Sequence, residues 1–408
     1  TLIRFENGKE VERTFSWHRE EWERISGVTN IGNGLMASKP GCGSLNVMPG
    51  TQERLQVKFG NTGITARQIE LPPLQDDIEA CYDRGWTDGL PVVPPTPERV
   101  LRMLKGTNRS PAEELGLVPP NRVPVTVQKV AINAVMAGCL PEYMPVVLAA
   151  VEAALLDEFC MHGLLATTWF SGPIVIVNGP ITKKIGMNSE GNALGQGNRA
   201  NATIGRALQL IIRNVGGGKP GGVDRACLGN PGKYTFCFAE REHDSPWSSL
   251  AKERGIPDGQ SAVTLFAGDG VQGIMDQRSR TPESLSKSFA MSLMNVAHTK
   301  VHMESDAILV VSPGHCRIFK SANWDKMKLR ETILALSITP WEDIARGAKG
   351  VAEGTAEKHK KPVLPKFKPD GLHIVRAGGN AGLFSAVIGG WVASGPKGST
   401  AVTVAIKE

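Results

Sequence analysis

Five short apolar runs constrain the fold of this chain more than any other feature. They have the length and β-rich composition of buried strands, and four of the five end in a glycine-containing turn. Helical periodicity follows several of these turns. Because strand, loop and helix alternate in this way, we expect an α/β fold: a largely parallel sheet flanked by helices, with ligands near the carboxyl ends of its strands. The runs are residues 173–177, 262–266, 307–311, 372–375 and 401–406, and the four turns are residues 178–180, 267–270, 312–315 and 377–382.

The chain before the first of these runs is predicted to be mostly helical after a small arm. Residues 1–75 show only short periodicity and contain a Gly-rich segment, which indicates an N-terminal strand-and-loop arm or small subdomain. Residues 126–138 and 141–159 carry small and aliphatic side chains at helical spacing, which predicts a buried helical hairpin. The main α/β region is expected to span residues 76–408, either undivided or as two lobes at 76–250 and 251–408.

Charge and hydropathy exclude several classes of protein. Basic residues exceed acidic ones by 46 to 40, and a net charge of +6 over 408 residues is too small to indicate nucleic-acid binding, although it suits an anionic substrate. The longest apolar stretches, residues 146–156 and 383–392, are shorter than the roughly 20 residues that span a bilayer, so no membrane association is expected. The N-terminus lacks a signal-peptide profile, which predicts a cytoplasmic location and leaves open whether residues upstream of Thr1 were removed.

A polar, Gly-rich loop that runs into an amphipathic helix, residues 188–206, is the strongest candidate for ligand binding. Glycines let backbone N–H groups approach a ligand, and a helix start adds unpaired donors, so a phosphate or carboxylate would suit this loop. Arg206 and Arg213 continue a seven-residue spacing from Arg199, which places all three on nearly one helix face. A solvated basic face behind an elaborate cap is the alternative. The candidate ligand-binding residues here are Asn188, Ser189, Asn192, Arg199, Asn201 and Arg206.

Residues 376–385 form a second candidate segment, where a strand is expected to pass into a helix. Dinucleotide-binding folds hold phosphate at such a junction, but these glycines do not follow Gly-x-Gly-x-x-Gly. A nicotinamide cofactor is therefore only weakly indicated, and the cofactor is left unknown. A tight turn with close packing would need the same glycines. The candidate ligand-binding residues are Gly378, Gly379, Asn380, Gly382 and Ser385.

Two Cys-containing sites are candidates for catalysis. His315 and Cys316 follow a predicted buried strand, where an acid/base group and a thiolate would reach the functional edge of the sheet. Cys237 and Glu240 follow an aromatic strand at residues 234–236, but a spacing of three puts them on opposite faces of an extended chain, so they need a turn to cooperate. Structural roles are the alternative. The catalytic candidates are His315, Cys237, Glu240 and Cys316.

Weaker signals complete the site predictions. His298 and His302 are four apart on an expected helix, but the glutamate of His-Glu-x-x-His is missing, so no metal site is predicted. Cys42 lies between glycines and is a candidate for a reactive thiol or a contact with a partner subunit. Asp88 lies in a Pro-rich extended stretch and is predicted to belong to a structural clamp. The seven cysteines include no Cys-x-x-Cys pair, so neither a disulfide framework nor a thiolate zinc site is predicted.

Three stretches together resemble bacterial proteins of the UGSC (seleno)protein family. They are residues 85–96 (GWTDGLPVVPPT), residues 188–206 and residues 234–240 (YTFCFAE), and the end segment 377–391 adds to the resemblance. The resemblance covers the chain from about residue 80 onward. Cys42-Gly-Ser-Leu45 echoes only part of the family's naming motif, and no catalytic role is transferred from it. The resemblance implies an α/β fold, thiol or selenol chemistry and a companion subunit.

We therefore expect an enzyme that acts on a small carboxylate- or phosphate-bearing metabolite by Cys/His polar chemistry, as a lyase or hydrolase does. The substrate is expected to lie against residues 188–201 and 378–385, with backbone amides stabilising an oxyanion. One alternative is a thiol- or selenol-linked redox enzyme, which the lack of a close cysteine pair disfavours. A second is a non-catalytic scaffold or regulatory subunit of a two-component enzyme. Homo-oligomerisation or binding of a companion subunit is expected, with the N-terminal arm as the docking element.

Overall fold

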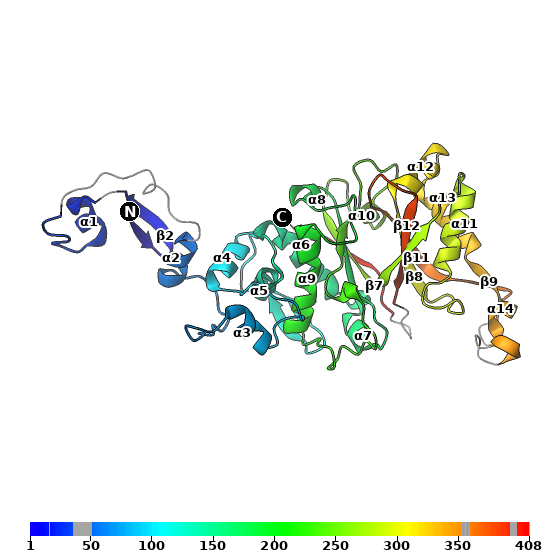
Figure 1. The fold of residues 1–408 in the computed structure, drawn as a ribbon, viewed down its shortest axis with the longest axis horizontal. Coiled ribbons are helices and arrows are strands. Elements are labelled where there is room, and N and C mark those ends of the chain that lie inside the picture. Colours follow the sequence, from blue (N-terminus) through cyan, green and yellow to red (C-terminus); the bar gives the residue numbers. More distant parts are fainter. Residues whose placement is uncertain are drawn as a thin grey trace.

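The structure is a computed structural model that describes residues 1–15, 17–35, 51–351, 354, 357, 360–391 and 398–407. An N-terminal arm extends from the body of the molecule (Figure 1). The arm consists of an antiparallel hairpin followed by two helices, and Glu53 of its second helix forms a 3.1 Å ion pair with Lys105 of the body. Its elements are β1 (Leu2–Glu6), β2 (Lys9–Thr14), α1 (Arg19–Ser26) and α2 (Thr51–Phe59).

The predicted helical hairpin follows the arm and is confirmed. Its first helix, α5 (Val127–Ala137), begins at Thr126, whose side chain accepts a hydrogen bond from the backbone N–H of Lys129. It ends at Gly138, where a φ of +89° favours glycine over every other residue. The second helix is α6 (Met144–Ala154). Other elements of this region are α3 (Asp77–Asp83), α4 (Pro97–Leu104), α7 (Met161–Ala166), the hairpin of β3 (Glu114–Val118) and β4 (Val123–Thr126), and the 3-10 turns Pro141–Tyr143 and Asp157–Phe159.

Seven strands of the described residues form one mixed sheet, in the order β11-β8-β12-β7-β5-β6 with β13 also paired to β7. The α/β class and the flanking helices are confirmed. The expected parallel pairing is found for β11 with β8 and for β5 with β6, while the other four pairs are antiparallel. The strands are β5 (Gly172–Asn178), β6 (Cys237–Ala239), β7 (Ala262–Met275), β8 (Ser305–Val311), β11 (Phe367–Arg376), β12 (Phe384–Gly390) and β13 (Val402–Ala405).

The same pairing pattern of three strands occurs in each half of the sheet. In the first half, β5 pairs in parallel with β6 on its outer side and antiparallel with β7 on its inner side. In the second half, β8 pairs in the same way with β11 and β12, and the two halves join where β12 pairs antiparallel with β7. The connecting elements are α8 (Ile181–Lys184), α9 (Arg199–Asn214), the 3-10 turn Pro231–Lys233 and α10 (Leu250–Glu253) in the first half, and α12 (Pro313–Ser321), α13 (Lys326–Leu336), β9 (Ile338–Pro340), α14 (Trp341–Ala345), the 3-10 turn Ala348–Gly350 and β10 (Val363–Pro365) in the second.

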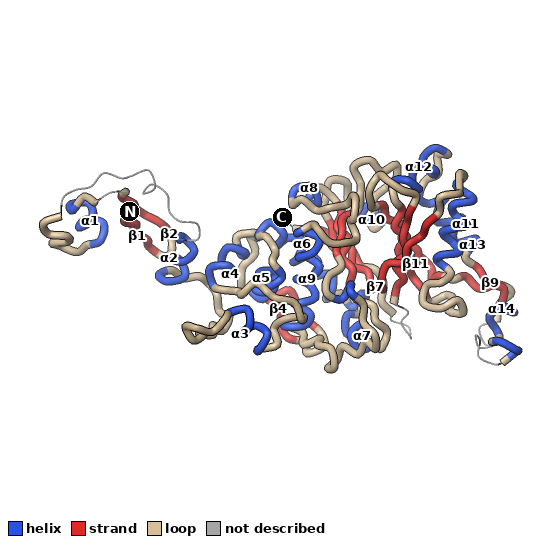
Figure 2. The backbone as a smooth tube through the Cα atoms, viewed as in Figure 1, coloured by secondary structure: helices blue, strands red, loops and turns tan. Residues whose placement is uncertain are grey.

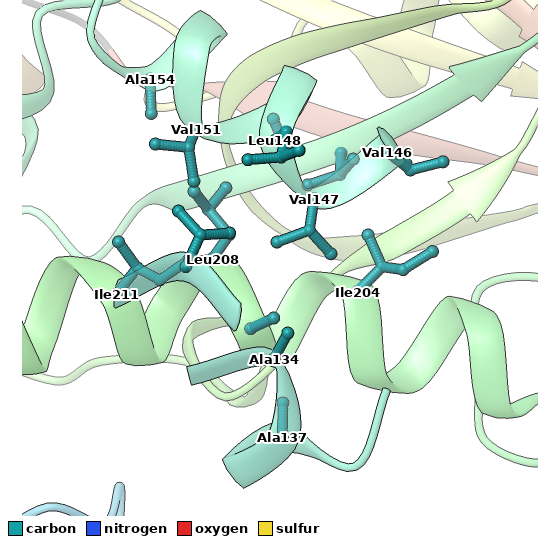
Figure 3. Packing of buried hydrophobic residues seen from close by; sticks show 14 of the residues in the cluster. Ala134, Ala137, Val146, Val147, Leu148, Val151, Ala154, Ile204, Leu208 and Ile211 are labelled. Carbon is teal, nitrogen blue, oxygen red and sulfur yellow. The ribbon is translucent and has the colours of Figure 1, made fainter. Parts of the chain in front are cut away.

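Alternate side chains of the strands enter different cores, because successive residues of a strand point to opposite faces. One face of β5 and β7 packs on α5, α6 and α9, where aliphatic side chains of the three helices interdigitate (Figure 3). The same face of β8, β11 and β12 packs on α12, α13 and α11 (Pro282–Leu293). Figure 2 shows the strands in red between these two groups of helices. The opposite face of all these strands encloses a third core that includes Phe238, Phe266 and Ile308.

The two outer edges of the sheet meet at their carboxyl ends, so the sheet curls on itself. The backbone N–H of Arg241, beyond β6, donates to the carbonyl of Arg376 at the end of β11 over 2.7 Å. Both arginine side chains are almost fully buried, and both pair with the carboxylate of Asp244. These charge-assisted hydrogen bonds hold the pKa of Asp244 well below its usual range, Arg376 contributing most.

Several sequence predictions about local structure were wrong. The aromatic run at residues 234–236 is not a strand but precedes one, because pairing with β5 begins only at Cys237. Residues 267–270 do not turn but lie within β7, because the strand continues into pairing with β12. Residues 376–385 lead into strand β12 and not into a helix, since the apolar run that follows is paired on both sides, by β7 and β8. His298 and His302 lie beyond the end of α11, outside any helix.

None of the described helices combines the length and the apolarity needed to cross a bilayer.

Candidate functional site

A cavity of about 1070 Å³ opens at the carboxyl ends of the parallel pair β5 and β6. In α/β sheets this is the edge at which ligands bind, because loops there leave the strands and are free to vary. β5 ends at Asn178, and Glu240 and Glu242 follow β6. All three line the cavity. The turn after β5 requires glycine, since Gly179 has a φ of +91° and a Cβ there would lie 2.5 Å from the carbonyl oxygen of Gln260.

One side-chain amide holds two carboxylates at this edge. Nδ2 of Asn178 donates to Oε2 of Glu240 over 2.7 Å and to Oε1 of Glu242 over 2.9 Å. Glu242 also accepts from the backbone N–H of Gly179, and Glu240 from that of Leu250. The buried Oδ1 of Asn178 has no hydrogen-bond partner among the described residues. The two carboxyl groups are therefore neighbours with fixed orientations. The unused Oδ1 of Asn178 beside them could accept a hydrogen bond from a ligand.

The Glu240 carboxyl lies in an environment that disfavours its charge. Its residue is only 4% exposed, and burial raises the pKa of the carboxyl. The charge of Lys326 and the hydrogen bonds from Leu250 and Asn178 act in the opposite direction without cancelling the effect. Nζ of Lys326 lies 3.7 Å from Glu240 and 3.4 Å from Glu253 and is itself buried, so its charge is shared between two carboxylates. A carboxyl group with a raised pKa keeps its proton to a higher pH than an ordinary glutamate and can donate it to a substrate.

The Gly-rich loop 188–198 covers the cavity and is held by side-chain amides. The side chain of Asn201, buried in the first turn of α9, accepts from the backbone N–H of Asn188 and donates to the carbonyls of Asn188 and Ala193. Asn188 and Ser189 line the cavity. The backbone N–H of Gly378 donates to the carbonyl of Ser189 over 3.0 Å, so the two Gly-rich segments singled out from the sequence meet in space.

The structure places the other predicted ligand-binding residues away from the cavity lining. Asn192 donates to the carbonyl of Gln196 within the loop, and Gly379 packs against Gly191. Nε of Arg199 donates to the carbonyl of Gly138, and Asn380 is exposed. Arg206 forms a bidentate pair with Asp88, which confirms that Asp88 belongs to a structural clamp and removes Arg206 from the anion pocket expected on that helix face. Gly382 lies beside Gly314 and the ring of Phe384.

His315 and Ser385 form a separate, enclosed pair. Nε2 of His315 lies 2.9 Å from the carbonyl oxygen of Asp276, which can only accept, so this nitrogen carries the proton. The Ser385 hydroxyl then donates to Nδ1 over 2.7 Å. His315 is 0% exposed and Ser385 7%, and burial lowers the pKa of the imidazole. Such a pair is the arrangement of a base and a hydroxyl nucleophile, but neither residue lines the cavity beyond β5 and β6.

The predicted catalytic cysteines are buried and do not line the cavity. Cys237 packs in the core beneath α9, and burial raises the pKa of its thiol far above the ordinary value. Burial also raises the pKa of Cys316, although the charge of Arg376 opposes it. Of the four catalytic candidates, the structure brings only Glu240 into the cavity. Cys42 lies outside the described residues.

Sequence reasoning missed Asn178, Lys183, Glu242 and His243, all of which line the cavity. A signal was present for Asn178, because it follows the apolar run 173–177 at the strand end where ligands were expected. Within the part of the chain that the structure describes, no group of three His, Cys, Asp or Glu side chains is arranged to hold a metal ion. No family model, curated protein or solved structure matches this chain, so its function has to be inferred from the geometry of the cavity.

Proposed function

We propose that this chain is an enzyme that transfers protons on a small polar metabolite bearing a carboxylate or phosphate, in a lyase- or hydrolase-like reaction. The observation that carries the proposal is the amide of Asn178, which fixes Glu240 and Glu242 side by side on the wall of a large cavity. Glu240 would act as the general acid, and Glu242 as the base of the pair. Two carboxyl groups in different environments can divide these roles, because one is more buried than the other.

The anionic group of the substrate is assigned to the exposed part of the cavity. Lys183 of α8 lines it with an exposed side chain, whereas Lys252, the other lysine of the lining, is paired with Asp258 at 2.8 Å. The loop 188–198 adds backbone groups close to the same region. An anion held there would keep its charge away from Glu240 and Glu242, so that an uncharged C–H or ester portion would face the two carboxyls.

Thiol redox chemistry, which the family resemblance implies, receives less support from the described residues. A nucleophilic cysteine needs a lowered pKa, and burial raises the pKa of Cys139, Cys237 and Cys316. A scaffold or regulatory subunit would give no reason for a carboxylate pair to be fixed on a cavity wall.

The test is exchange of hydrogen for deuterium. Purified protein in D₂O is incubated with a panel of small carboxylates and phosphate esters, and the loss of substrate C–H signals and the appearance of products are followed by NMR. Wild-type protein is expected to act on at least one compound. Glu240→Gln and Glu242→Gln should lower kcat by about 10²–10⁴, the contribution of a general acid or base, and Lys183→Met should mainly raise KM.

Glu331→Gln is the control, because Glu331 is an exposed carboxylate of α13 that does not line the cavity. It should retain kcat. Equal activity in wild type and in both Glu240→Gln and Glu242→Gln would contradict the proposal. Activity that appears only when a second polypeptide is added would favour the subunit alternative.

A further inference from the structure

A second cavity, of about 480 Å³, lies at the other end of β5. Gly172 and Pro173 at the start of the strand line it, whereas Asn178 at the end of the strand lines the cavity described above. The two cavities are therefore separated by the length of a seven-residue strand, about 20 Å. Helix α9 also extends between the two cavities. The loop before its first turn lines the first cavity, and residues of its last two turns line the second.

Two side chains of α9 that line this second cavity carry donors without a hydrogen-bond partner among the described residues. Gln209 and Arg213 are four residues apart and so lie on one face of the helix, and both line the cavity. Nε2 of Gln209 and Nε of Arg213 are buried, and neither atom has a hydrogen-bond partner among the described residues. The other arginines of the same face differ, since Arg206 is paired with Asp88 and Arg199 bonds the carbonyl of Gly138. A buried donor without an acceptor is costly, so a ligand that supplied an acceptor to these atoms would be favoured.

The charges of the lining favour an anion. Asp224 is paired with Lys233 at 2.7 Å, and Asp88 with Arg206, so both acidic residues of the lining are already matched by cations. Arg213 is a cation of the lining for which no unmatched carboxylate of the lining is left. Gly172 keeps the space beside Gln209 open, because a Cβ at this position would lie 3.6 Å from Nε2 of Gln209 and 3.2 Å from Cγ of Lys233.

Part of the remaining wall is apolar. Leu164 and Leu165 of α7 and Ile212 of α9 line it, and the two leucines and Ile212 are almost fully buried. A ligand that satisfies both parts of the lining carries one acceptor-rich anionic group and a compact hydrocarbon body. A free phosphate would meet the donors but leave the apolar wall uncovered.

We propose that this cavity is a binding site for an organic monocarboxylate with an apolar body, separate from the carboxylate pair. The carboxylate accepts hydrogen bonds from Arg213 and Gln209, and the hydrocarbon part packs on Leu164, Leu165 and Ile212. This inference does not depend on the proposed reaction, because no residue of the second cavity lines the first.

The experiment is a binding measurement on the full chain with benzoate and hexanoate, by ligand-observed NMR and calorimetry. Benzyl alcohol and hexanol serve as uncharged probes of the same size, and inorganic phosphate as an anion without an apolar body. Benzoate or hexanoate is expected to bind at millimolar concentration or below, with the alcohols and phosphate at least tenfold weaker. Arg213→Met should weaken carboxylate binding by about tenfold to hundredfold, the effect of losing a hydrogen bond to a charged group.

Arg199→Met is the matched control on the same helix and should bind as wild type does. Gln209→Leu provides a second variant if Arg213→Met fails to fold, and it should also weaken binding. Lys183→Met separates the two cavities: loss of carboxylate binding in this variant alone would assign the ligand to the first cavity and overturn the proposal. Unchanged binding in both Arg213→Met and Gln209→Leu, equal binding of the alcohols, or no carboxylate binding at millimolar concentration would overturn it as well.

Discussion

Replacement of Arg206 by Met should destabilise the protein rather than weaken a ligand. The guanidinium donates to both carboxylate oxygens of Asp88 at 2.8 Å and to the carbonyls of Leu90 and Pro91 at 3.2 and 2.9 Å. It thereby fixes the Pro-rich stretch against α9. The side chains of Arg206 and Asp88 are 15% and 11% exposed, so Arg206→Met leaves a nearly buried carboxylate without its counter-ion. Breaking a buried pair costs about 3–5 kcal/mol, and the residual exposure places this variant near 3 kcal/mol.

The pH dependence of this loss follows from the pKa of Asp88. Burial by itself would raise this pKa, but the hydrogen bonds and the charge of Arg206 outweigh burial and lower it below the ordinary value. A lowered pKa contributes stability that is present above the unfolded pKa of about 3.9 and is lost as the pH falls through the folded pKa. The difference in unfolding free energy between wild type and Arg206→Met should therefore be largest at neutral pH and shrink below pH 4.

Urea unfolding followed by tryptophan fluorescence measures the difference, with Arg199→Met as the control for loss of an arginine from the same helix. In a double-mutant cycle, Asp88→Asn in the Arg206→Met background should recover part of the lost stability, because it removes the uncompensated charge. A coupling free energy of about 1–3 kcal/mol is expected. If Arg206→Met unfolds at the wild-type urea concentration, or if the cycle shows no coupling, the structural role assigned to Arg206 is refuted.

Two further predictions concern groups whose pKa is raised by burial. Alkylation of the native protein, mapped by peptide mass spectrometry, should label the exposed Cys227 but neither Cys237 nor Cys139. Burial raises the pKa of the Cys139 thiol to about 12 and that of the Cys237 thiol far above the ordinary value. Labelling of these two cysteines without prior unfolding would show that their thiols are accessible. Burial raises the pKa of Asp269 to about 6, despite hydrogen bonds from Ser171 and Trp169. Wild-type stability should therefore fall as the pH rises from about 4 to 6, and urea titrations should show Asp269→Asn becoming more stable relative to wild type over that interval. A pH-independent difference between the two proteins would contradict this.

The sequence by itself predicted the helical hairpin, the helix after the Gly-rich loop and most strands of the large sheet, because their signals are local. Thr126, Asn198 and Ser312 cap helices with side chains that accept backbone hydrogen bonds, and such caps are visible in the sequence. Buried strands such as β5 and β8 have uninterrupted apolar runs. The signal failed for residues 376–385, where glycines before an apolar run are compatible with either a helix or a strand. Only pairing with β7 and β8, both distant in sequence, decided the matter.

The candidate site was predictable only in part. The sequence alone indicated the Gly-rich loop 188–198, its helix and Glu240, because glycine content and position after a strand are properties of the chain. It could not show that Arg206 pairs with Asp88, which is 118 positions away, or that Nε of Arg213 has no hydrogen-bond partner among the described residues. Nor could it show that one amide, of Asn178, joins Glu240 to Glu242. Local propensity and periodicity depend on neighbours in the chain, whereas the partner of a charge depends on which segments the sheet brings together; that choice was made by the tertiary structure.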